Sequence, residues 1–152
     1  MKTLSIVAAF IPILLAGCFS CKDTGNLLIP AATRFDYVTI ESGFYSPTSR
    51  IVLSKEDSIA VKDLFADCTE CQYGYDPDVM IKPAIRYTVT FRRNRQSETF
   101  APSVAFGPSR ELYQARCKHV VTQAKITRIL TPYMAEVDRL EAKVHRDEKP
   151  VY

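Results

Sequence analysis

Histidine is scarce in this chain, and that scarcity narrows the chemistry the protein can perform. The only histidines are His119 and His145, and the sequence contains neither a Gly-x-Ser-x-Gly elbow nor a His-Glu-x-x-His pair. Hydrolases that depend on those motifs are therefore disfavoured, and we expect that the protein is not an enzyme. The formal net charge of +3 is too small to predict a nucleic-acid partner.

Long apolar runs are also absent, apart from one at the amino terminus. Lys2 precedes an apolar stretch that ends in Leu15-Ala16-Gly17-Cys18. A basic start, a short apolar segment and small residues before a cleavage point are typical of a secretory signal peptide. Pro12 interrupts the run, which is shorter than the roughly 20 residues that a transmembrane helix needs. We therefore favour a signal peptide over a membrane span.

The tetrapeptide Leu15-Ala16-Gly17-Cys18 resembles the lipobox of bacterial lipoproteins. In that family the cysteine thiol receives a diacylglycerol, and a dedicated peptidase cuts before it. The resemblance implies that Cys18 becomes the first residue and carries acyl chains such as palmitate, which make the membrane a partner. In enteric lipoproteins an Asp after this cysteine favours the inner membrane. Phe19 therefore implies, for a Gram-negative host, an outer-membrane protein facing the periplasm.

The four remaining cysteines fit an exported protein. An even set in an oxidising compartment predicts disulfides, and the sequence leaves all three pairings of Cys21, Cys68, Cys71 and Cys117 open. We expect these disulfides to be structural.

Two other interpretations of the cysteines involve chemistry. Cys68 and Cys71 have the spacing of a thiol–disulfide active site, but the predicted helix end and the flanking Asp67 and Glu70 oppose a reactive thiolate. Alternatively, Cys68, Cys71, Cys117 and His119 supply a zinc-ligand set. No cofactor is expected, with zinc as the alternative.

The mature chain predicts a single α+β domain with a small antiparallel sheet, one inserted helix and C-terminal helices. Strands are expected over 34–41, 50–53, 85–92 and 99–106, and a helix over 55–68 that Ser54 caps. Strict alternation over 85–92 predicts one buried face and one solvent-facing face. Pro102 requires a sheet edge or a bulge.

The expected organisation has four parts: a signal peptide (1–17), the lipidated cysteine with a polar tether (18–33), the globular domain (34–130) and a charged helix with a tail (131–152). Residues 27–29 packing back onto the domain are an alternative to a fully extended tether. Ser109 is expected to cap a further helix, with a strand over 112–121 as the alternative. Thr131-Pro132 is expected to begin the last helix.

Two surfaces are candidates for binding. Arg92, Arg93 and Arg95 form a basic cluster near a predicted hairpin turn, suited to lipid phosphates, anionic glycans or an acidic protein. The alternative is a soluble turn that protects a sheet edge. Tyr73 and Tyr75, beside Asp76 and Asp78, are the second candidate, with core packing as the alternative.

These patterns predict a lipid-anchored binding or accessory protein of the cell envelope, with another envelope protein as its partner. The alternatives are a thiol-redox or zinc-binding protein centred on Cys68 and Cys71, and a structural envelope lipoprotein.

Overall fold

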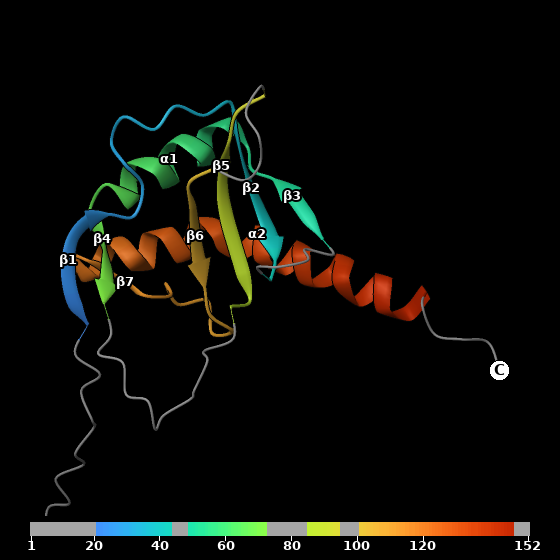
Figure 1. Cartoon of the computed structure of the whole chain (residues 1–152). Helices are drawn as coiled ribbons and strands as arrows, with labels where there is room; N and C mark the ends of the chain where they lie inside the picture. Colours follow the sequence, from blue (N-terminus) through green and yellow to red (C-terminus); the bar gives the residue numbers. More distant parts are fainter. Residues whose placement is uncertain (1–20, 44–48, 73–84, 95–100, 148–152) are drawn as a thin grey trace, which may run out of the picture.

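The computed structural model describes residues 21–43, 49–72, 85–94 and 101–147. Within them the chain forms two antiparallel sheets, of three and four strands, with one helix inserted between strands and a long helix at the carboxy terminus (Figure 1). The predicted α+β class is confirmed, with a second sheet in addition to the expected one.

The four-stranded sheet has the order β3-β2-β5-β6. Its members are β2 (Tyr37–Ser42), β3 (Arg50–Val52), β5 (Tyr87–Arg92) and β6 (Ser103–Phe106). Each strand lies within or beside a predicted one. Pro102 immediately precedes the edge strand β6, so the prediction that this proline lies at a sheet edge is confirmed.

The three-stranded sheet has the order β1-β4-β7, and the sequence did not predict it. It contains β1 (Lys22–Leu27), β4 (Cys68–Gln72) and β7 (Ala115–Cys117). The prediction of an irregular tether over 19–33 is wrong for β1, which pairs with β4. All six β1 side chains are exposed, so the strand lacks the apolar alternation that would reveal it. Ile29, just beyond β1, is buried, as the alternative of packing back predicted.

Helix α1 (Lys55–Phe65) begins where predicted, because the Ser54 hydroxyl accepts a 3.1 Å hydrogen bond from the Asp57 backbone N–H. The prediction that the helix reaches Cys68 is wrong. Cys68 continues the apolar spacing of the helix but begins β4, where its carbonyl accepts a bond from the Leu28 N–H. Cross-strand pairing therefore overrides helical periodicity at this point.

Helix α2 (Val120–Asp147) is a single helix and contains Pro132 in its interior. The predicted break at Thr131-Pro132 is wrong. Ile126, Leu130, Met134 and Val137 are all buried and recur at helical spacing on both sides of the proline. Continuous packing of this stripe offsets the hydrogen bond that proline removes. The predicted helix from residue 110 is also absent, and β7 partly matches the alternative strand over 112–121.

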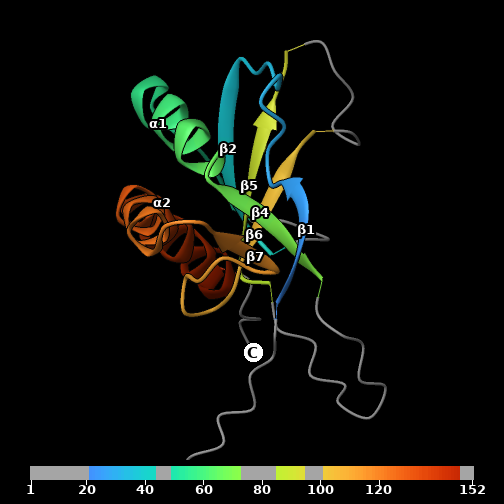
Figure 2. The same ribbon diagram turned by 90° about the vertical axis from the view of Figure 1, so that its left-hand side faces the viewer.

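Both helices cover the same side of the sheets (Figure 2). The core between helices and sheets is built on aromatic rings: Phe65 of α1 packs against Phe91 of β5 and Phe106 of β6, with centroid separations of 6.2 and 6.5 Å. Neither of the helices that the structure describes combines the length and hydrophobicity that a bilayer-spanning segment needs.

Candidate functional site

A basic pocket lies where the segment before β2, helix α1 and the end of β5 meet. Its volume is about 460 Å³, and its lining consists of Thr33, Arg34, Phe35, Asp36, Lys62 and Arg93. A pocket of this size accommodates a small ligand or a few side chains of a partner protein. The first four residues lead into β2, Lys62 comes from α1, and Arg93 directly follows β5.

Backbone hydrogen bonds fix the frame of the pocket. The Asp36 N–H donates to the Arg92 carbonyl at 2.8 Å, and the Asp36 carboxylate accepts from the Asn94 N–H at 2.8 Å. These two bonds join the start of β2 to the end of β5. Asp36, the one carboxylate among the described lining residues, is thus already engaged by a backbone donor.

Phe35 forms an apolar wall beside the cations. Its ring meets Phe91 edge to face with a centroid separation of 5.3 Å, which connects the pocket to the core. The Lys62 ammonium nitrogen lies 5.9 Å from the centroid of the same ring. This cation–π contact restrains Lys62 without neutralising its charge.

The pocket carries a positive charge. Three cations and one carboxylate line it, and the structure records no ion pair for Arg34, Lys62 or Arg93 within the ranges it describes. Arg34 and Arg93 are exposed, and Lys62 is half-buried. An arrangement of this kind attracts carboxylate, phosphate or sulfate groups.

Of the predicted arginine cluster, the structure places Arg93 in the pocket but Arg92 elsewhere. Arg92 is 7% exposed, and its guanidinium contacts Glu41 at 2.5 Å and the Thr39 hydroxyl at 3.0 Å. The prediction that Arg92 forms part of a binding surface is therefore wrong. Successive strand residues point to opposite faces, so Arg92 joins the polar face of the sheet and Arg93 does not.

The polar face of β5 also differs from the prediction that it faces solvent, because its side chains are almost fully buried. Thr88 and Thr90 are as buried as Arg92. The opposing strand β2 contributes Glu41, which also pairs with the Nε atom of Arg50 at 2.8 Å. The alternation correctly predicted which residues share the polar face. It did not predict the burial of that face, which hydrogen bonds and ion pairs between the polar groups allow.

The cysteines form two structural crosslinks. Cys68 pairs with Cys117, and Cys71 pairs with Cys21. The close spacing of Cys68 and Cys71 does not join them to each other, because residues three apart on a strand point to opposite faces. Neither the thiol active site nor the four-ligand zinc set is assembled, and no cluster of three or more metal-ligating side chains occurs in the described part of the chain.

His119, the fourth predicted zinc ligand, contacts Asp67 next to the start of α2 instead. Its ring Nδ1 lies 3.0 Å from both carboxylate oxygens of Asp67. The Thr122 hydroxyl donates to the same carboxylate at 2.6 Å. This hydroxyl holds the pKa of Asp67 below its ordinary value, although burial acts in the opposite direction. Asp67, which follows α1, therefore accepts hydrogen bonds from the His119 backbone N–H and the Thr122 hydroxyl at the start of α2.

The remaining predicted residues, Cys18, Tyr73, Tyr75 and Arg95, lie outside the described residues, and their roles stay predictions. Sequence reasoning did not find Arg34 or Lys62. The only local sign was a cation beside an aromatic residue at Arg34 and Phe35, and Lys62 is a half-buried lysine in an ordinary amphipathic helix. Tertiary structure alone brings them to Arg93.

No protein-family model, curated protein or solved structure matches this chain.

Proposed function

We propose that this chain is a lipid-anchored accessory protein of the cell envelope that binds an acidic partner protein through the basic pocket. The single observation that carries the binding role is a group of three cations around one engaged carboxylate. Arg34, Lys62 and Arg93 form no ion pair with any residue that the structure describes. The anchor rests on the lipobox resemblance at Cys18. Two disulfides support folding in an oxidising compartment, as an exported protein requires.

The exposure of the cations favours a protein partner over an isolated small anion. Single ion pairs at exposed sites contribute only about 0–1 kcal/mol. A useful affinity therefore requires several such pairs together with apolar contact, and Phe35 supplies the apolar surface. Arginines and aromatic rings are both enriched in protein–protein interfaces. The partner would present carboxylates around a small apolar group.

The binding role is tested by crosslinking the full-length protein in native membranes and recovering it with its partner. Replacing Arg34, Lys62 and Arg93 by Gln removes three charges while preserving most of the side-chain volume. The matched control replaces Lys125, Arg128 and Lys143, three exposed cations of α2, by Gln. We expect the pocket variant to lose partner recovery about tenfold or more, and the control to retain it.

Salt adds a second criterion, because attraction between exposed charges weakens as the Debye length shortens. Recovery by the unmodified protein should fall as salt rises, and the residual recovery by the pocket variant should not. Equal recovery of the same partner by both triple variants would contradict the binding role and favour a structural envelope lipoprotein. The anchor is tested separately by the mass of the mature protein, which must include lipid on Cys18.

A further inference from the structure

The lipid and the folded domain are separated by very little chain. On the proposed function, Cys18 carries the lipid, and Cys21 lies three residues further along. Three fully extended residues span at most about 11 Å. Cys21 is bonded to Cys71 of β4, so the domain begins at that residue.

The chain beyond Cys21 is also held to the sheet, because β1 pairs with β4 at both of its ends, with an irregularity between Asp23 and Leu27. Lys22 is opposite Gln72, and the Thr24 hydroxyl donates to the Glu70 carbonyl at 3.1 Å. After the strand, Leu28 donates to the Cys68 carbonyl and Ile29 is 2% exposed. The 15-residue tether predicted from the sequence is therefore replaced by a three-residue link.

The residues around the Cys21–Cys71 crosslink form one end of the three-stranded sheet, which we call the base. Lys22, Gln72 and Gln114 are exposed there, and the Gln114 carbonyl accepts a 2.8 Å bond from the Cys71 N–H. Asp23, opposite Cys71, is exposed there as well. The base is therefore polar, with the charges of Lys22 and Asp23 in balance, which allows contact with zwitterionic lipid headgroups.

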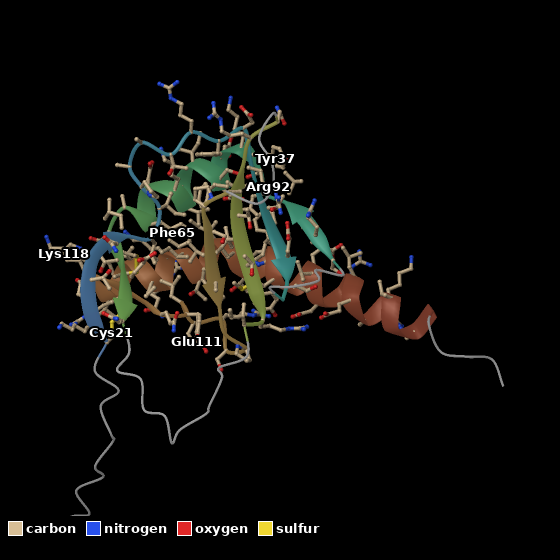
Figure 3. All side chains as sticks on the ribbon, viewed as in Figure 1. Cys21, Tyr37, Phe65, Arg92, Glu111 and Lys118 are labelled. Atoms are coloured by element: carbon tan, nitrogen blue, oxygen red, sulfur yellow. A yellow bond between two sulfur atoms is a disulfide. The ribbon has the colours of Figure 1, made fainter. Side chains whose placement is uncertain are left out.

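The basic pocket lies at the opposite end of the molecule. Figure 3 places Cys21 at the lower left and the pair Tyr37 and Arg92 at the upper right of the sheets. Asp36 precedes Tyr37 and Arg93 follows Arg92, so both pocket residues share that upper end. The chain connects the two ends, because it runs from Lys22 at the base along β1 to the segment that lines the pocket (Figure 1).

We propose that the Cys21–Cys71 disulfide limits the connection between the lipid and the domain to a short link of three residues. This short link holds the base on the headgroups of the anchoring membrane, and the basic pocket then points away from that membrane. This inference rests on the proposed lipidation of Cys18. Phospholipids of the anchoring membrane are then out of reach of the pocket. Its acidic partner approaches the pocket from the side that is farther from the anchoring membrane.

The sequence contains no tryptophan, so a single introduced tryptophan reports its own position. The full-length lipidated protein is placed in phosphatidylethanolamine–phosphatidylglycerol vesicles that contain a dansyl-labelled lipid. Energy transfer is measured from Gln72→Trp at the base and from Asn94→Trp beside the pocket. Both positions are exposed. We expect several-fold stronger transfer from Gln72→Trp, and similar transfer from the two positions would overturn the proposal.

Removing the Cys21–Cys71 disulfide, and with it the short link, provides the second measurement. Replacing both Cys21 and Cys71 by Ala removes the covalent bond between β1 and β4. Once β1 separates from β4, the chain from Cys18 to Ile29 can span about 40 Å. We expect the difference between the two tryptophan positions to shrink. An unchanged difference would show that β1 pairing, and not the disulfide, holds the domain down, and would overturn the role assigned to the crosslink.

Failure of the anchor is distinguishable from failure of this inference. The mass of the mature protein reports lipid on Cys18 independently of fluorescence. Absence of lipid would overturn both the proposed anchoring and the proposed role of the short link. Lipid on Cys18 together with equal energy transfer from Gln72→Trp and Asn94→Trp would overturn the proposed role of the short link and would not contradict the proposed function.

Discussion

Breaking the Cys68–Cys117 disulfide should destabilise the protein more than breaking the other disulfide. Its loop spans 49 residues, and closing such a loop in the unfolded chain removes entropy equivalent to about 4 kcal/mol at 25 °C. Cys68 is fully buried and Cys117 is 9% exposed, so the crosslink also joins β4 to β7 within the core. We expect the double replacement of Cys68 and Cys117 by Ala to lower the free energy of unfolding by about 4 kcal/mol.

The Cys21–Cys71 disulfide provides the matched control, because its sequence separation of 50 predicts almost the same loop entropy. The strand that it secures, however, is an edge strand with every side chain exposed. Without the crosslink, β1 can separate from β4 while the rest of the domain stays folded. The double replacement of Cys21 and Cys71 by Ala should therefore cost clearly less global stability.

Both variants are compared by urea denaturation in a soluble form that carries Cys18→Ser, with circular dichroism as the signal and linear extrapolation to water. Equal losses in the two variants would refute the argument, because they would show that β1 folds and unfolds with the core. A loss below about 1 kcal/mol for the Cys68 and Cys117 variant would refute the loop-entropy estimate itself.

Two further predictions concern polar side chains. Arg92→Ala leaves the buried Glu41 with the partly exposed Arg50 as its remaining ion-pair partner, and we expect urea denaturation to show a loss of about 3 kcal/mol. Arg93→Ala, the neighbouring control, should change stability by less than about 0.5 kcal/mol. The pKa of Asp67 is lowered in the folded state, so its contribution is complete above the unfolded-state pKa of about 4 and is lost as pH falls toward the lower folded pKa. Asp67→Asn should therefore make the loss of stability below about pH 4 less steep in denaturation at stepped pH.

Each of these predictions has a contradicting result. Equal effects of Arg92→Ala and Arg93→Ala would mean that burial of the Arg92–Glu41 pair has no energetic consequence. An unchanged acid profile for Asp67→Asn would mean that the bonds of Asp67 to Thr122 and His119 do not stabilise the ionised carboxylate.

Elements whose causes are local could be predicted from the sequence. The start of α1 depends on Ser54 and Asp57, which lie three residues apart, and β5 depends on alternation within a single segment. Elements whose causes are distant were missed. Strand β1 is a strand because β4 lies beside it, and the helix does not stop at Pro132 because buried residues on both sides share one face. A window of sequence contains neither cause.

The candidate site shows the same division. Arg93 stood out because it belongs to a run of arginines. The run did not reveal that Arg92 is buried on the polar face of the sheet, whereas the adjacent Arg93 is exposed at the pocket. Arg34 and Lys62 lie in separate segments and reach Arg93 only through folding. Cysteine pairing was likewise undetermined, because the spacing of Cys68 and Cys71 does not reveal that both lie on one strand with different partners.

The two disulfides overlap along the chain, and this overlap bears on proteolysis. One joins residues 21 and 71 and the other joins 68 and 117, so every peptide bond between Cys21 and Cys117 is spanned by at least one crosslink. A single cut anywhere in that interval leaves the fragments covalently joined. A protease could therefore nick this region without releasing the pocket residues, all of which lie inside it. On a gel without reductant such a nicked protein would keep its full mass, and on a gel with reductant it would separate into two pieces.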